Sequence, residues 1–429
     1  MTSVLFTPTR YFPSISGAEL YIQRLAEILK SNYDIYVKVL TSNAVDFRAL
    51  HSSNGRVIKP YSKYFEFVNN IEVYRLPIDY ELSIEQKLEK IQNAAEIKLL
   101  NLTDDTIKKF LQNGPFLKDL DDFFEKNKTH DFDIVHTTFY PYFNLILSLM
   151  IAKRLNVPVI CTPFFHFSNP RYLDPEMFII LKKFDLLIAC TELEKKIIQN
   201  ILNIPGEKIR VIPMGVDYTA FSNSYNKMND FNFKKHYFQK NERKYKMILF
   251  CGYKNFEKGA LSILKTIPTI IRRFKKVYFV FIGPSTIAFN RELSKIRKIK
   301  DVRIINLSPD NLTGYLDKKK ISAFKTSDIY LMPSRSDAFG IAFLEAWAAG
   351  KPVIGADIGA TSEVIRNQID GLLVRFNDKD EICKAVLKLL KSRALRKKLG
   401  QTGKEKVSHY YTWEKVVKKT FEIYSEFKK

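Results

Sequence analysis

Two carboxylates eight positions apart, Asp337 and Glu345, carry the clearest chemical signal in the sequence. They lie in DAFGIAFLEAWAAG, residues 337–350, where Glu345 is the only charge after Asp337. A helix that is apolar on every side is buried, and burying an unpaired carboxylate is costly unless something hydrogen-bonds it. Glu345 therefore needs a partner, and the nature of that partner indicates what this region does.

The residues before Glu345 predict an anion site at the start of a helix. DIYLMP at 328–333 is typical of a strand, and the helix is predicted to begin near Phe339. Free backbone N–H groups at a helix start favour an anion such as phosphate, and Gly340 lets a ligand approach the backbone closely. The two carboxylates could accept hydroxyl hydrogen bonds from a sugar on one side and a ribose on the other. Spacing alone leaves open the alternative of a helix N-cap Asp followed by a satisfied core Glu.

The composition is that of a soluble globular protein with more than one domain. The chain has 429 residues, of which 46% are hydrophobic and 27% charged, and this length predicts two or three domains, two of them large. The longest uncharged stretch near the middle, 137–152, is shorter than the ~20 apolar residues of a membrane-spanning helix. The stretch MTSVLFTPTRYFP has no basic leader and no cleavable apolar segment, so we expect a cytoplasmic protein. The four cysteines lack metal-ligand spacing and are expected to be reduced structural thiols.

The net charge of +23 lies entirely in the second half of the chain. Residues 1–200 contain 24 basic and 24 acidic side chains, whereas residues 201–429 contain 45 and 22. A basic half can attract a nucleoside diphosphate, an anionic membrane surface or nucleic acid. Much of the excess, including the run near 388–398, is expected to be solvated helix face. No RNA- or DNA-binding motif accompanies the charge, so a nucleic-acid-binding protein is the least favoured reading.

Short apolar runs alternate with amphipathic segments along the chain, which predicts parallel strands crossed by helices. The fold class expected is α/β, with two facing Rossmann-like doubly wound domains and a ligand in the cleft between them, beyond the carboxyl ends of the strands. The predicted strands are 3–8, 132–138, 157–163, 185–190 and 209–213 in the first half, and 246–252, 277–283, 302–306, 328–333, 351–356 and 371–374 in the second.

Four segments follow from this pattern. An N-terminal domain spans 1–220, with one or two inserted helices in 83–126, and a polar connection covers 221–245. A second Rossmann-like domain spans 246–410. An amphipathic helix in 411–429 is expected to pack back on the N-terminal domain.

The stretch DIYLMPSRSDAFGIAFLEAWAAGKPVIGADIGATSEVI resembles the hallmark region of the retaining GT-B glycosyltransferases of family 4. Further matches occur in order along nearly the whole chain: YFPSISGAELYIQRLAEIL at the N-terminus, VIPMGVDYTAF at 211–221, GYKNFEKGA after the strand at 246–252, and FIGPS at 281–285. The resemblance implies the GT-B fold and transfer of a hexose, with retention of configuration, from a nucleoside diphosphate sugar to a glycan or lipid-linked acceptor.

The resemblance also implies roles for individual residues of a donor site. Glu345 would bind the ribose hydroxyls, Asp337 would contact the hexose, and Lys258, helped by Lys254, would neutralise the diphosphate. The remaining donor contacts would come from the backbone and from glycine turns, at Gly17, Gly252, Pro284, Phe339, Gly340 and Ile341. No carboxylate cluster suggests a metal, similar enzymes work without one, and no cofactor is expected beside the donor substrate.

His166 follows the strand at 157–163, where the family commonly has a histidine that reaches toward the reacting sugar. The resemblance makes it a predicted catalytic residue together with Asp337 and Glu345, the leaving phosphate itself accepting the acceptor's proton on the same face. A packed, hydrogen-bonded side chain is the alternative, and for His136 it is the preferred one.

Some residues depart from the family pattern. Asp337 stands where the family usually has Glu, and Tyr253 where an Arg usually helps to bind diphosphate. The rival functions are a nucleotide-sugar epimerase or hydrolase on the same architecture. The basic second half and abundant aromatic residues further predict peripheral contact with an anionic membrane surface on the cytoplasmic face.

Overall fold

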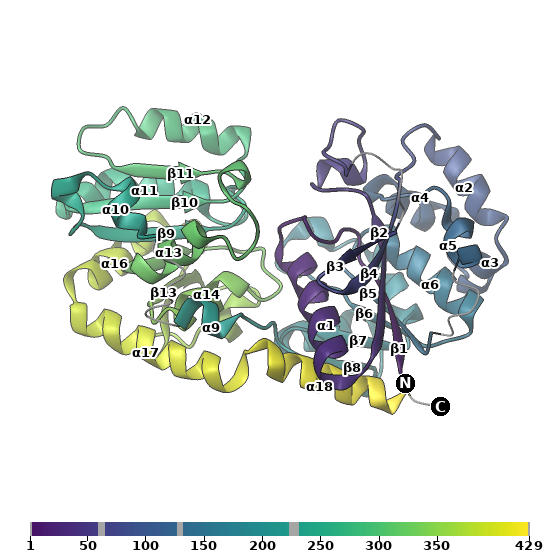
Figure 1. The fold of residues 1–429 in the computed structure, drawn as a ribbon. Coiled ribbons are helices and arrows are strands. Elements are labelled where there is room, and N and C mark those ends of the chain that lie inside the picture. Colours follow the sequence, from purple (N-terminus) through teal and green to yellow (C-terminus); the bar gives the residue numbers. More distant parts are fainter. Residues whose placement is uncertain (1, 59–64, 127–131, 223–230, 428–429) are drawn as a thin grey trace. The chain divides into compact units, whose positions relative to one another are not determined.

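The computed structural model describes residues 2–58, 65–126, 132–222 and 231–427, which form two compact units (Figure 1). The first unit comprises Met1–Phe165, Pro170–Pro213 and Trp413–Lys429. The second comprises His166–Asn169 and Met214–Thr412. Each unit is built on its own sheet, so the predicted class of two doubly wound α/β domains is confirmed.

The first unit contains, in its described residues, an eight-stranded sheet in the order β3-β4-β2-β1-β5-β6-β7-β8. All neighbours pair in parallel except β3 and β4, which are antiparallel at one edge. The central strands are buried apolar runs, as expected of a sheet covered on both faces. The strands are β1 Ser3–Thr7, β2 Tyr36–Ser42, β3 Phe65–Val68, β4 Ile71–Leu76, β5 Ile134–Thr138, β6 Val159–Thr162, β7 Leu186–Ala189 and β8 Ile209–Val211.

Helices α1 to α8 connect these strands, and the C-terminal helix α18 also belongs to this unit, where it packs on α1. A capping box at Ser83 starts the first of four helices in residues 83–126, all of them described, where one or two were expected. The helices are α1 Gly17–Tyr33, α2 Ile84–Gln92, α3 Ala95–Leu100, α4 Asp104–Asn113, α5 Leu120–Lys126, α6 Asn144–Leu155, α7 Pro175–Phe178, α8 Glu192–Leu202 and α18 Trp413–Glu426.

The second unit contains a six-stranded sheet, within the described residues, in the order β11-β10-β9-β12-β13-β14. Every pair is parallel. The strand order reverses between β9 and β12, so the loops that follow these two strands begin side by side at the carboxyl edge. The strands are β9 Lys246–Cys251, β10 Val277–Ile282, β11 Ile304–Leu307, β12 Ile329–Met332, β13 Val353–Ala356 and β14 Gly371–Val374.

Helices accompany this sheet as they do the first (Figure 1), and α11 packs against α16 while α14 packs against α17. The predicted connection 221–245 lies partly outside the described residues, and its described part includes α10. The helices are α9 Tyr218–Ser222, α10 Phe233–Tyr237, α11 Ala260–Arg273, α12 Ile287–Ile296, α13 Lys318–Thr326, α14 Ile341–Ala348, α15 Thr361–Val364, α16 Lys379–Lys391 and α17 Arg393–Tyr410. Across the described chain, none of the helices has the length and hydropathy needed to cross a membrane.

Candidate functional site

The candidate site is formed by two loops at the switch point of the second sheet. The loop 252–259 follows β9, and the loop 333–340 follows β12. Ser334 Oγ donates to the carbonyl of Glu257 at 3.2 Å, and the Arg335 N–H donates to the same carbonyl at 3.0 Å. Gly259 has φ +76°, and a Cβ there would lie 2.4 Å from the Pro333 carbonyl oxygen. The close contact of the two loops therefore requires a glycine at position 259.

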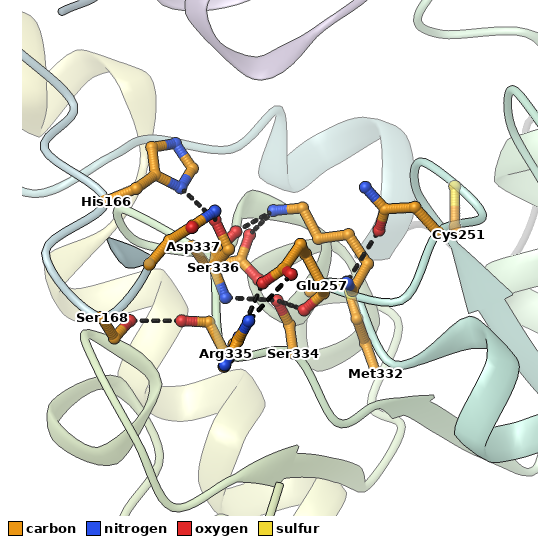
Figure 2. Close-up of polar contacts among 12 residues, drawn as sticks. His166, Ser168, Cys251, Glu257, Met332, Ser334, Arg335, Ser336 and Asp337 are labelled. Atoms are coloured by element: carbon orange, nitrogen blue, oxygen red, sulfur yellow. Dashed lines mark hydrogen bonds and ion pairs between the residues drawn. The ribbon is translucent and has the colours of Figure 1, made fainter. Parts of the chain in front are cut away.

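The Glu257 carboxylate makes a second link between these loops. Arg335 Nε and Nη2 donate to its two oxygens at 2.7 and 3.0 Å, a bidentate pair (Figure 2). Sequence reasoning did not assign a role to Arg335. Its position directly after Pro333–Ser334 is the signal that could have found it, because a side chain at a strand end meets the neighbouring loop of a parallel sheet.

Lys258 and Asp337 form an ion pair across the same two loops. The Lys258 ammonium donates to Asp337 Oδ1 and, at 2.6 Å, to the carbonyl of Ser336. The Asp337 residue is only 9% exposed, and its other oxygen, Oδ2, is buried without a hydrogen-bond partner among the described residues. Two residues predicted to contact different parts of a donor thus lie together, and one buried acceptor atom of the pair is unused.

His166 belongs to the second unit and lies beside Ser336 (Figure 2). Its Nδ1 is 3.0 Å from Ser336 Oγ, which also accepts a hydrogen bond from Asn169 Nδ2 at 3.2 Å. Burial, reinforced by the nearby Lys258 ammonium, lowers the pKa of His166 to about 4. The imidazole is therefore neutral at pH 7, and it can act there as a hydrogen-bonding group but not as a cation.

Glu345 is fully buried, and its protein partner is Lys320. Lys320 Nζ on α13 donates to Glu345 Oε1 on α14 at 2.7 Å, and the two residues are 6% and 0% exposed. Burial raises the pKa of Glu345, an effect that Lys320 and the Tyr315 hydroxyl oppose. Oε2 is buried and makes no hydrogen bond of normal geometry with a described residue. Sequence reasoning anticipated the need for a partner but not Lys320.

The start of α14 presents backbone and no polar side chain. The helix follows Gly340, whose φ is +95°, and a Cβ there would lie 2.6 Å from the Phe343 ring. Phe339 and Ile341 are 3% and 7% exposed, and their side chains are apolar, so only backbone groups of this turn could hydrogen-bond a ligand. This arrangement suits an anion bound by N–H groups, as the predicted role of these three residues requires.

The predicted donor residues in the glycine turns lie at the ends of β9 and β10. Gly283 has φ +129°, and a Cβ there would lie 2.2 Å from the Gly252 carbonyl oxygen, whereas one on Gly252 would meet no atom closer than 3.7 Å. Packing therefore requires glycine at 283 but not at 252. Pro284 contributes a carbonyl that accepts the Lys254 N–H at 2.8 Å.

Lys254 does not join Lys258. It is fully buried, and its ammonium donates to Asn306 Oδ1 at 2.6 Å and to the Leu307 carbonyl at 2.9 Å. Burial lowers the pKa of Lys254 to about 8. These contacts tie the loop after β9 to the end of β11, and its predicted contact with a donor diphosphate stays a prediction.

Two predicted residues lie in the first unit. Gly17 is the first residue of α1, preceded by Ser16, whose hydroxyl donates to Glu19. The contact of Gly17 with a donor stays a prediction. His136 is fully buried, with Nδ1 2.6 Å from the Tyr424 hydroxyl and Nε2 2.9 Å from Thr162 Oγ1. This side chain joins α18 to the sheet, which is the structural role preferred for it from the sequence.

Comparison with known proteins identifies the class to which this fold and site belong. Sucrose-phosphate synthase from Thermosynechococcus elongatus superposes with a TM-score of 0.73 at 15% identity, covering 99% of each chain. Anabaena HepE in complex with UDP-glucose gives 0.69 at 12% identity, covering 99% of this chain and 100% of the other. The chain therefore has the GT-B fold of glycosyltransferases.

The family follows from the sequence. Residues 232–406 match the model of the glycosyl transferases group 1, and residues 93–220 match that of glycosyltransferase family 4. The chain is a glycosyltransferase that is similar to family 4, and the resemblance noted from its motifs is confirmed.

Individual relatives agree with this assignment at low identity. An uncharacterized glycosyltransferase of Methanocaldococcus jannaschii is 24% identical over 98% of this chain and 97% of its own length, and another from that organism is 27% identical over 56% and 59%. The phosphatidyl-myo-inositol mannosyltransferase of Mycolicibacterium smegmatis is 26% identical over 68% of this chain and 71% of its own.

Proposed function

We propose that the second unit binds a nucleoside diphosphate sugar and that the chain transfers its hexose to an acceptor with retention of configuration. The observation that carries the proposal is a feature that the Asp337 and Glu345 carboxylates share. Each carboxylate uses one oxygen on a lysine and leaves the other buried without a hydrogen bond of normal geometry in the described residues. A buried acceptor without a well-formed hydrogen bond is costly, and sugar and ribose hydroxyls would supply such bonds to both carboxylates.

The start of α14 supports a diphosphate between these two hydroxyl-binding groups. The turn at Gly340 lies on the chain between Asp337 and Glu345, and the Lys258 ammonium is already at Asp337. Helix N–H groups and a lysine are the elements that stabilise phosphate oxygens. Among the structural neighbours, one is described in complex with UDP-glucose and another with UDP-2-fluoro glucose, which agrees with such a donor.

In the proposed reaction, the bond between the hexose anomeric carbon and the diphosphate oxygen breaks, and its electron pair stays on that oxygen. The acceptor hydroxyl oxygen bonds to the anomeric carbon from the same face, and its proton passes to the leaving phosphate. Lys258 stabilises the growing negative charge, and neutral His166 hydrogen-bonds near the reacting carbon. The step needs no metal and no cofactor beside the donor.

The acceptor is a glycan or a lipid-linked saccharide in this proposal, and the enzyme works in the cytoplasm at the surface of an anionic membrane. The charge of the second half and the relative described as a phosphatidyl-myo-inositol mannosyltransferase support it. Sedimentation with anionic and neutral vesicles tests the membrane contact. Equal recovery with both vesicle types would contradict it.

A panel of UDP-, GDP- and ADP-sugars, measured by thermal unfolding and by turnover, tests the donor assignment. A ligand at 100 times its Kd should stabilise the folded state by about 2.7 kcal/mol. The proposal is wrong if Glu345→Ala protein, shown to be folded by circular dichroism, turns over a nucleotide sugar as fast as the unmodified chain. Release of free sugar or of an epimer without acceptor would instead support the hydrolase or epimerase alternative.

A further inference from the structure

Lys320 is a buried lysine for which the proposed function has no role. It lies on α13, is 6% exposed, and its ammonium donates to Glu345 Oε1 at 2.7 Å. The ammonium is also 3.5 Å from the centre of the Tyr315 ring, within cation–π distance. Lys320 is thus held on one side by a carboxylate and on another by an aromatic face, so its position is well defined.

A purely structural ion pair is the simpler explanation, and the energetics of buried pairs argue against it. Replacing such a pair by well-packed apolar residues is often neutral or stabilising, so an ionic contact is not needed to hold α13 against α14. The two oxygens of Glu345 also differ in their contacts. The pair occupies only Oε1 of Glu345, and Oε2 is buried without a hydrogen bond of normal geometry to any residue that the structure describes. Lys320 and the Tyr315 hydroxyl thus leave Oε2 with acceptor capacity that packing alone does not require.

The groups around Glu345 show why a cation is required there. Lys320 is the cation that lowers its pKa, and the Tyr315 hydroxyl acts in the same direction. Asp217 raises it, and Cys251 and Tyr330 also face the carboxylate. Without Lys320, burial and Asp217 would favour the protonated acid. A protonated carboxyl is a poorer acceptor for two hydroxyl hydrogens than a carboxylate is.

We propose that Lys320 is a positioning residue for the nucleotide: it keeps Glu345 ionised and oriented so that Oε2 accepts hydrogen bonds from the ribose hydroxyls. The inference rests on the proposed function, because it takes the site occupant to be a nucleoside diphosphate. It assigns to Lys320 no contact with the reacting atoms. Its effect is on donor binding, and the rate of the chemical step depends on other residues.

The test is a thermodynamic cycle between Lys320 and the ribose. Binding of UDP, GDP and ADP to the full-length unmodified chain is measured by calorimetry, and the tightest binder is then compared with its 2′-deoxy and 3′-deoxy forms. The same titrations are made with Lys320→Met and with Lys318→Met, an exposed lysine of the same helix that serves as control. Lys320→Gln replaces the methionine variant if circular dichroism shows that the latter is unfolded.

We expect Lys320→Met to weaken nucleotide binding by about tenfold or more, the loss typical of a charge-assisted hydrogen bond. The preference for the ribose form over the deoxy forms should disappear in this variant and persist in Lys318→Met. Loss of the cation raises the pKa of Glu345. As the pH is lowered, Lys320→Met should therefore lose nucleotide binding at a higher pH than the unmodified chain does. Lys320→Arg should restore the ribose preference.

Two results would overturn the inference while leaving the proposed function intact. One is a folded Lys320→Met variant that keeps the full ribose preference. The other is a loss of kcat with no change in the KM for the donor. If none of the three nucleotides binds the unmodified chain, the proposed function itself fails, and that outcome is visible before any variant is made.

Discussion

Two lysine–carboxylate pairs of the second unit, Lys258–Asp337 and Lys320–Glu345, differ in how far they are withdrawn from water. The first joins two loops, with side chains 21% and 9% exposed, and the second joins two helices, with side chains 7% and 1% exposed. In both pairs one carboxylate oxygen is bound to the lysine, and the other is buried without a hydrogen bond of normal geometry in the described residues. Under the proposed function, this difference predicts that Lys258–Asp337, the open pair, exchanges partners with an incoming diphosphate. Lys320–Glu345, the closed pair, would then be a fixed part of the binding surface.

The closed pair should give the largest effect when broken. Glu345→Ala leaves Lys320 as an uncompensated buried charge, which is expected to lower the free energy of unfolding by about 3–5 kcal/mol. Donor binding should be lost with it. Urea denaturation and calorimetry measure the two effects. The matched control is Glu363→Ala, whose carboxylate lies on α15 in the same unit, and an equal loss of stability there would contradict the comparison.

The open pair should affect the rate more than the stability. Lys258→Ala removes a cation that stabilises charge on the leaving diphosphate, so kcat should fall about 10²–10³-fold. This pair is more exposed than Lys320–Glu345, so its loss should lower the free energy of unfolding by less than the about 3–5 kcal/mol expected for that buried pair. Steady-state kinetics with the preferred donor and urea denaturation measure both. A variant that loses several kcal/mol but little kcat would reverse the roles assigned to the two pairs.

His166, beside the open pair, should make stability depend on pH. Its pKa falls from 6.5 to about 4 on folding, so the unfolded chain binds a proton between these values that the folded chain does not. His166 therefore costs the folded state nothing above pH 6.5, and the free energy of unfolding decreases as the pH falls from 6.5 toward 4. His166→Gln should make the free energy of unfolding less dependent on pH in this range, and the dependence due to His136, whose pKa burial lowers to about 3, should remain. The turnover of the unmodified chain should show no inflection from His166 near pH 6.5, and an inflection that disappears in His166→Gln would contradict the assignment.

The smallest effect is expected from lengthening the carboxylate of the open pair. Asp337→Glu adds one methylene at a position that is 9% exposed and should change kcat/KM by only a few-fold, with the direction showing whether the shorter arm suits the donor. Asp337→Asn is the control, because it keeps the size of the side chain and removes its charge. It should lower kcat/KM more than Asp337→Glu does. Kinetics with each nucleotide sugar of the panel compare the three chains.

Most of the fold was predictable because buried parallel strands are continuous apolar runs. All eleven strands expected from the sequence are present, with ends shifted by a few residues. Strands β2, β3 and β4 were not predicted. Charged residues such as Lys38 in β2 and Glu72 in β4 interrupt the apolar runs, and the buried Lys38 is compensated by a cross-strand ion pair of 3.2 Å with Glu72. That pair exists only once the strands are adjacent.

The candidate site was predictable to the level of motifs. The sequence located the two carboxylates, the turn at Gly340 and the lysine at 258, and the structure brings Lys258, Asp337 and His166 together within the second unit. It does not bring Lys254 to them, because the ammonium of that lysine is bound within the sheet edge at Asn306 and Leu307. A lysine in a motif carries no sign of which way its side chain points.

The sequence by itself determined the two-sheet fold, the glycosyltransferase family and the need of Glu345 for a partner, because apolar periodicity, motif order and a lone charge are local properties. Only the tertiary structure decided the partners. Lys320 is 25 residues from Glu345 and Lys258 is 79 residues from Asp337 along the chain. Contacts at such separations depend on how helices pack and in which order strands pair, and neighbouring residues along the chain do not encode either.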